Sequence, residues 1–130
     1  MMRIEPYVYR GRFESCLSKS HAQRILILVA LSRKEVFIDH LFEGRVGDDV
    51  GFMISAFRKI GYSFEENDAG LLMKPPKQNS KYSHIEINIG ESGFGLRSFA
   101  SVLSHFSKNY VLAGEKTILK RNHSSLIASI

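Results

Sequence analysis

The sequence predicts an α/β (α+β) fold that is built from two similar units. Alternating, strand-like segments and apolar-periodic, helix-like segments follow one another along the 130 residues. The order strand, small-residue turn, helix, strand, helix occurs twice, and Ser20 and Ser92 occupy equivalent places (92 − 20 = 72 residues apart). The first unit, over about residues 13–74, closes with a hairpin, whereas the second, over 84–130, stops before it could have one.

The first unit is expected to begin with a strand over Phe13–Leu17, after a β-rich segment at Ile4–Tyr9. The helix that follows Ser20 is apolar on nearly every face, so we expect it to be buried on both sides and to end at Ser32-Arg33-Lys34. A second strand is predicted over Glu35–Leu41. A glycine-containing loop, 42–47, then leads to the next helix.

Asp48 and Asp49 open that next helix, where capping and the helix dipole explain them better than a metal site. Its apolar residues follow the i, i+3, i+4, i+7 pattern: Val50, Met53, Ile54, Phe57 and Ile60. Gly61 fits the position that closes it. The remaining predicted elements are a hairpin of Tyr62–Glu66 and Leu71–Lys74, a linker at Pro75–Ser80, strands at His84–Ile89 and Asn109–Ala113, and helices starting at Ser92 and at Ser124.

Composition limits the function classes without choosing among them. The net charge of +5 and the pI near 9.5 favour anionic partners, but the basic residues are dispersed and form no tract typical of nucleic-acid binding. The single cysteine, Cys16, forms no intramolecular disulfide and fits a reducing compartment. The longest apolar run, Ile25–Leu31, is too short to span a membrane. We expect a cytoplasmic protein.

The strongest local signal for a binding site is the octapeptide from Leu17 to Arg24. Ser20 and Gln23 have the Ser-x-x-Gln form of a capping box, which predicts Ser20 at the N-cap and Gln23 reaching back to it. Lys19 and Arg24 would then flank free backbone amides at the positive end of the helix dipole, which favours a phosphate or carboxylate. The alternative is an ordinary helix start with two solvated cations.

Four segments in the same order resemble EPSP synthase, the 3-phosphoshikimate 1-carboxyvinyltransferase family. They are Ser18–Arg24 with the apolar run after it, Gly44–Gly61, Gly90–Arg97 and Gly114–Arg121. The resemblance implies βαβαββ repeat units, of which this chain would contain one complete unit and part of a second. Residues 1–130 would be an incomplete N-terminal domain, a fragment of a monomeric cytoplasmic enzyme.

The resemblance also implies an activity and its site residues. The family transfers the enolpyruvyl group of phosphoenolpyruvate to shikimate-3-phosphate. Lys19, Ser20 and Arg24 resemble the residues that bind shikimate-3-phosphate, and Lys19, Gly93 and Arg121 those that bind phosphoenolpyruvate. No cofactor, metal, nucleic acid or membrane is implied, and the family's acid–base residues have no counterpart in this chain. We therefore expect the fragment to be inactive.

Some positions depart from the family's commoner pattern. Glu91 replaces a frequent Asn and would add negative charge near an anion site, Phe94 adds bulk beside Gly93, and Asn122 replaces a frequent Pro. Arg97 is expected to make a structural ion pair and not to bind a ligand.

Two other functions stay open on the sequence. One is the related enolpyruvyl transferase that acts on UDP-N-acetylglucosamine. Two features argue against it: that family usually has Lys-Asn where this chain has Lys19-Ser20, and its reactive cysteine lies in a loop, whereas Cys16 lies in a predicted strand. The other is a non-catalytic, basic nucleic-acid-binding module, which would need exposed aromatic side chains. Most of the nine phenylalanines fall on apolar helix stripes, which indicates core positions.

Overall fold

A computed structural model describes residues 10–11, 18–40, 47–77 and 82–129. The expected strand at Phe13–Leu17, including Cys16, and the segment Ile4–Tyr9 lie outside the described residues, as does nearly all of the loop before Gly47. Among the described residues no helix is long and apolar enough to cross a membrane.

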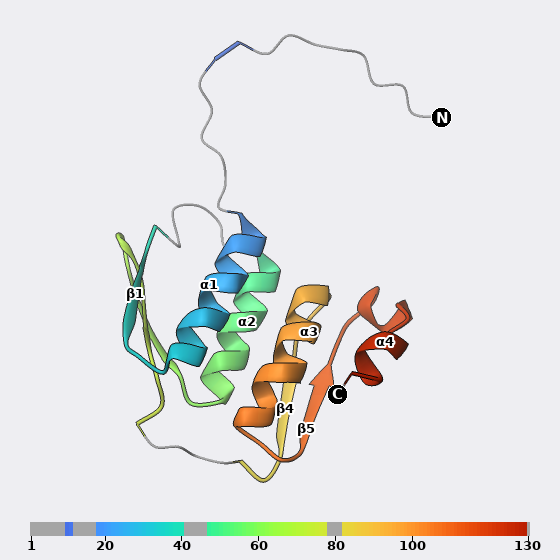
Figure 1. Cartoon of the computed structure of the whole chain (residues 1–130). Helices are drawn as coiled ribbons and strands as arrows, with labels where there is room; N and C mark the ends of the chain where they lie inside the picture. The colour runs from blue at the N-terminus through green and yellow to red at the C-terminus, as the bar shows by residue number, and fades with distance from the viewer. Residues whose placement is uncertain (1–9, 12–17, 41–46, 78–81, 130) are drawn as a thin grey trace.

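The described chain is a mixed α/β structure with two small sheets (Figure 1). β1 (Val36–Asp39), β3 (Gly70–Lys74) and β2 (Ser63–Asn67) form an antiparallel sheet in the order β1-β3-β2, whereas β4 (Ile85–Asn88) and β5 (Tyr110–Ala113) pair in parallel. The helical elements are α1 (Lys19–Ser32), α2 (Asp48–Lys59), α3 (Gly93–Val102), η1 (Leu103–His105), η2 (Ile118–Lys120) and α4 (Ser124–Ile127).

The three long helices α1, α2 and α3 run side by side with their N-terminal ends at the same end of the molecule (Figure 1). Phe57 of α2 and Phe99 of α3 are fully buried, and their ring centroids lie 5.1 Å apart. Both rings belong to one cluster of buried residues that includes Met73 of β3 and Ile87 of β4, so one hydrophobic core joins both sheets. The first turns of all three helices therefore lie at one end of the molecule, and those of α1 and α2 have no side-chain cap on their backbone amides.

The predicted pattern of α2 is confirmed, since Val50, Met53, Ile54, Phe57 and Ile60 are all buried. The hairpin is confirmed as well. The Asn67 side-chain oxygen accepts from the backbone N–H groups of Ala69 (3.0 Å) and Gly70 (3.1 Å), which closes the turn between β2 and β3.

The predicted start of α1 is wrong by two residues. The N-cap is Ser18, whose carbonyl oxygen accepts from the backbone N–H groups of His21 and Ala22, so Ser20 lies inside the first helical turn. No side-chain hydrogen bond caps this helix. The capping box does not form because the Gln23 side chain is buried and bonds another helix. A tertiary partner thus displaces the local one.

The N-cap of α3 is Ser92, as predicted, and its Oγ accepts from the backbone N–H of Gly95 at 3.0 Å. Both helices thus have a serine at the N-cap, Ser18 in α1 and Ser92 in α3, and these serines are 74 residues apart (92 − 18 = 74), whereas Ser20 is not at a cap. The same offset of 74 residues separates the first residues of β1 and β5, Val36 and Tyr110 (110 − 36 = 74).

The expectation that α1 is buried on both sides is also wrong in this chain. Ala22, Leu26 and Ala30 are buried, but Leu28 is 65% exposed and Leu31 is 48% exposed. Only one face of α1 packs against described residues, because α2 and α3 cover it from the same side.

Two glycine replacements should change stability in opposite directions. A Cβ at Gly70 would lie 2.3 Å from the carbonyl oxygen of Ile38, so Gly70→Ala must push β1 and β3 apart and should lower the free energy of unfolding by about 2 kcal/mol. Gly51, inside α2, has no atom within 4 Å of such a Cβ, so Gly51→Ala should raise stability by up to about 1 kcal/mol. Urea unfolding followed by circular dichroism measures both. Equal effects of the two replacements would contradict the strand contact at Gly70.

Candidate anion-binding site

The first two turns of α1 carry the three residues predicted to bind an anion there. Lys19, Ser20 and Arg24 are all exposed. Arg24 Nη1 donates to the Ser20 carbonyl oxygen at 3.1 Å, which confirms that the two residues share one side of the helix. The Arg24 guanidinium also lies 5.5 Å from the centroid of the Phe94 ring on α3. The guanidinium is thus oriented from two sides, and its other N–H groups have no partner among residues 18–40, 47–77 and 82–129.

Lys19 carries a partner that the sequence pattern did not reveal. Its Nζ lies 2.9 Å from Asp49 Oδ2, in the first turn of α2. This ion pair connects the N-terminal ends of two helices that are 30 residues apart (49 − 19 = 30). An anion that binds Lys19 must therefore compete with, or share the ammonium with, the Asp49 carboxylate. The lysine side chain is more than half exposed, so water weakens the pair and the ammonium can turn.

Two arginines surround Gly93 at the start of α3. A Cβ built on Gly93 would lie 3.1 Å from Arg121 Nη1 and 3.6 Å from Arg97 Nη1. Arg97 Nη1 donates to the Gly93 carbonyl oxygen at 3.1 Å, and Arg97 makes no ion pair with any described residue, contrary to the expectation stated above. Gly93 thus leaves room for two guanidinium groups beside the N-terminus of α3, an arrangement that attracts anions.

The loop that carries Arg121 is fixed to the turn before α3 by Glu91. The Glu91 carboxylate accepts from the Thr117 hydroxyl and, at 3.4 Å, from the Thr117 backbone N–H, and Lys116 Nζ lies 3.5 Å from it. The Thr117 hydrogen bonds and the Lys116 charge lower the pKa of Glu91. Its negative charge is therefore compensated within the loop instead of opposing an anion at Gly93.

Further hydrogen bonds hold the same loop at its start. The Glu115 backbone N–H donates to the Gly90 carbonyl oxygen at 2.9 Å, and Asn88 Nδ2 donates to Glu115 Oε1 at 2.7 Å. Gly114 is required here, because a Cβ would lie 2.4 Å from Ile118 Cγ2. The loop thus follows β5 in a single, well-determined path to Arg121.

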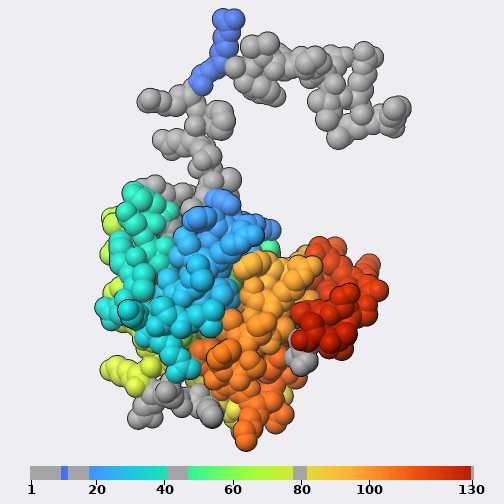
Figure 2. All heavy atoms as spheres, viewed as in Figure 1, coloured from blue at the N-terminus to red at the C-terminus, as the bar shows by residue number. Residues whose placement is uncertain are grey.

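A buried hydrogen bond joins the α1 and α3 sides of the site. Gln23 is 1% exposed and Ser92 is 2% exposed, and Gln23 Nε2 donates to Ser92 Oγ at 3.0 Å. Figure 2 shows α1 and the start of α3 side by side on one face of the molecule. Sequence reasoning missed this contact because the partners are 69 residues apart and Gln23 had a plausible local partner.

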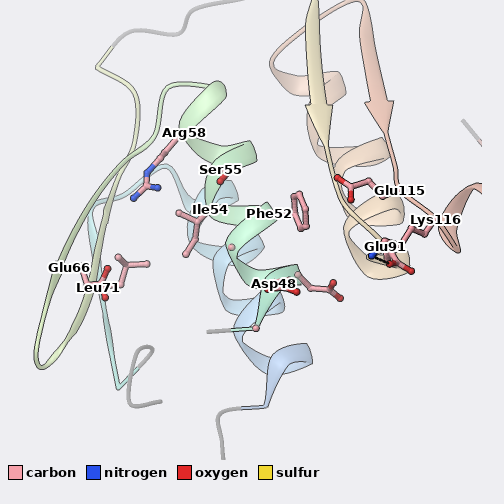
Figure 3. Close-up of a pocket in the computed structure, with 13 residues that line it drawn as sticks. Asp48, Phe52, Ile54, Ser55, Arg58, Glu66, Leu71, Glu91, Glu115 and Lys116 are labelled. Atoms are coloured by element: carbon pink, nitrogen blue, oxygen red, sulfur yellow. Dashed lines mark ion pairs between the residues drawn. The ribbon is translucent and has the colours of Figure 1, made fainter. Parts of the chain in front are cut away.

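A hollow of about 640 Å³ lies beside the cationic residues and shares Asp49, Glu91 and Lys116 with their surroundings (Figure 3). It is formed between α2, the β2–β3 hairpin and the loops after β4 and β5, and its lining contains more carboxylates than cations. The lining charges are Asp48, Asp49, Glu66, Glu91 and Glu115 against Arg58 and Lys116. It contains none of the predicted site residues, and its negative excess disfavours a phosphorylated ligand. Among the described residues no group of His, Cys, Asp and Glu has the geometry of a metal site.

Comparison with known proteins agrees with the resemblance. The sequence model of the family described as EPSP synthase (3-phosphoshikimate 1-carboxyvinyltransferase) matches residues 8–129. Curated relatives named 3-phosphoshikimate 1-carboxyvinyltransferase occur in Staphylococcus epidermidis, with 29% identity over 87% of this chain, and in Chlamydia muridarum, with 30% identity over 98%. The chloroplastic relative of Arabidopsis thaliana is 29% identical over 87% of the chain.

The chain matches only a small part of each relative. The chain spans about a quarter of their length, namely 26%, 28% and 23% of the three proteins in that order. The family match nevertheless covers nearly all of this chain, including every residue of the cationic site. The chain therefore belongs to the EPSP synthase family.

Proposed function

We propose that this chain is the substrate-binding N-terminal part of an enzyme that transfers the enolpyruvyl group of phosphoenolpyruvate to shikimate-3-phosphate. The relatives carry the name of this transferase, and the chain matches about a quarter of each. The observation that carries the proposal is the convergence of exposed cations at the parallel N-terminal ends of α1 and α3, linked by the buried Gln23–Ser92 hydrogen bond. Two anionic substrates repel each other, so an enzyme that joins them needs such a cationic site.

Lys19, Ser20 and Arg24 form the proposed shikimate-3-phosphate subsite. Arg24 offers a planar fork whose orientation is set by the Ser20 carbonyl and the Phe94 ring, which suits two oxygens of one phosphoryl group. Ser20 adds an exposed hydroxyl on the same side of α1, and Lys19 adds a mobile charge. The partial positive charge of the α1 N-terminus acts in the same direction.

Gly93 and Arg121, with Lys19, form the proposed phosphoenolpyruvate subsite. The absent Cβ of Gly93 lets the backbone and the Arg121 guanidinium approach the same small anion. Arg97, whose Nη1 lies almost as near, adds a second guanidinium to this subsite. The cations would hold the two substrates in contact and stabilise charge as the phosphate of phosphoenolpyruvate leaves.

We further propose that the chain consists of βαβαββ repeat units, with one unit over about residues 13–74 and part of a second over 84–130. The common offset of 74 residues between the N-caps of α1 and α3 and between β1 and β5 supports this division. Such a repeat explains why equivalent helix N-termini lie at one end and why each supplies an anion subsite.

The isolated 130-residue chain should show no turnover. It carries cations that position substrates, whereas the nearest carboxylate to Gly93 in sequence, Glu91, is engaged by Thr117 and Lys116 and is poorly placed as an acid–base group. A coupled assay of phosphate release with both substrates tests this expectation. Rates typical of an enzyme, about 1 per second or more, would contradict it.

The phosphate-binding role of Arg24 predicts a specific loss of affinity. Arg24→Lys keeps the positive charge but removes the planar fork, so calorimetric affinity for shikimate-3-phosphate should fall at least about tenfold. The matched control is Arg58→Lys, because Arg58 stacks on Phe64 at 5.4 Å in the same manner, near the C-terminal end of α2. The control should bind as the unaltered chain does. Equal losses in both variants would remove Arg24 from the subsite.

The Glu91 contact should loosen in acid. The pKa of Glu91 in the folded chain is below its ordinary value of 4.5, so the contact is complete above that value and is lost as the pH falls through the lowered pKa. The NMR shift of the Thr117 backbone amide should titrate below pH 4.5 and should stop titrating in Glu91→Gln. Glu86→Gln, on the exposed side of β4, is the control and should leave the titration intact. A Thr117 titration that persists in Glu91→Gln would contradict the assignment.

A further inference from the structure

The Gln23–Ser92 hydrogen bond is unusual because both of its side chains are buried and belong to different units. Among the described residues the other buried side chains with a polar group are Ser107 and Tyr62, and the Tyr62 hydroxyl bonds a backbone carbonyl and not a second side chain. Burying an amide costs free energy unless it is hydrogen-bonded, so the Gln23 amide has a strong preference for keeping its serine partner. The contact therefore restrains α1 and α3 relative to each other at one defined point.

Ser92 passes this restraint on to the backbone of α3. Its Oγ accepts from Gln23 Nε2 and from the Gly95 backbone N–H, each at 3.0 Å. A Cβ on Gly95 would lie 3.1 Å from Ser92 Cβ and Oγ, so the serine is also tightly packed against the turn that it caps. A displacement of Gln23 must therefore move the first turn of α3, which contains Gly93.

Each partner is the sequence neighbour of a proposed ligand residue. Gln23 precedes Arg24, and Ser92 precedes Gly93. The cation–π contact between Arg24 and Phe94 crosses the same junction, at 5.5 Å from the guanidinium to the ring centroid. A covalent and hydrogen-bonded path from Arg24 to Gly93 thus runs through the Gln23 side chain and Ser92.

We propose that Gln23 is a positioning residue that sets the separation of the two anion subsites and transmits the occupancy of one to the other. This inference rests on the proposed function. Gln23 touches no substrate, because it is buried, and it acts through Ser92 on the amides of the α3 N-terminus. Shikimate-3-phosphate bound at Arg24 would hold α1 and, through Gln23, order the turn at Gly93.

The test follows the Gly93 and Gly95 amides by NMR while the 130-residue chain is titrated with shikimate-3-phosphate. In the unaltered chain the ligand should shift both amides and slow hydrogen exchange of Gly95 about tenfold, the order of a modest coupling between sites. Gln23→Met keeps the length of the side chain and removes the donor. It should bind shikimate-3-phosphate with little change in affinity but show no response at Gly95.

The matched control is Tyr62→Phe, which removes a buried hydrogen bond at 2.7 Å to the Ala30 carbonyl, at the other end of α1. It should keep both the affinity and the Gly95 response. A Gly95 response that survives in Gln23→Met, or that disappears equally in Tyr62→Phe, overturns the positioning role and leaves the proposed function standing.

The unaltered chain distinguishes the two proposals. If it binds shikimate-3-phosphate but its Gly95 exchange does not slow, the positioning role is overturned even where Gln23→Met fails to fold. If it shows no binding of shikimate-3-phosphate at millimolar ligand, the proposed function fails, and the positioning role fails with it.

Discussion

The packing of Phe57 against Phe99 is the contact on which the arrangement of the site depends. It joins α2 to α3 in one core, and α1 packs beside both helices. Because the three helices run in the same direction, their partial positive charges add at one end of the molecule. The cationic site follows from this packing, since Lys19, Arg24 and Gly93 all lie in first or second helical turns.

Placing several cations at one end of the molecule costs free energy through charge repulsion. Polar, acidic and aromatic groups near the cations reduce this cost. Asp49 pairs with Lys19, the Phe94 ring faces Arg24, and backbone carbonyls accept from Arg24 and Arg97. These contacts orient the cations without neutralising most of them. At the proposed site an anion would meet donors whose side-chain entropy is already partly lost, which would make its binding free energy more favourable.

Local patterns predicted the elements well where local physics decides the structure. The apolar stripe of α2, the Asn67 turn and the Ser92 cap each depend on residues within a few positions, and the structure confirms them. The start of α1 was mispredicted because Gln23 has two possible partners. The buried hydrogen bond from Gln23 to Ser92 is more favourable in free energy than a solvent-exposed bond from Gln23 to the end of its own helix. Patterns of neighbouring residues cannot reveal this contact, because the two residues are 69 positions apart.

Contacts between distant residues also account for two of the positions that depart from the family's commoner pattern, Glu91 and Phe94. Glu91 and Phe94 flank Ser92 and Gly93, where added charge and bulk could be expected to weaken an anion site. In the structure each has a compensating partner within the chain: Glu91 faces Thr117 and Lys116, and Phe94 faces Arg24. The Glu91 carboxylate contacts the loop that leads to Arg121, and the face of the Phe94 ring lies against the Arg24 guanidinium. Both substitutions therefore fix the cationic residues in place, and neither removes positive charge from the Gly93 turn.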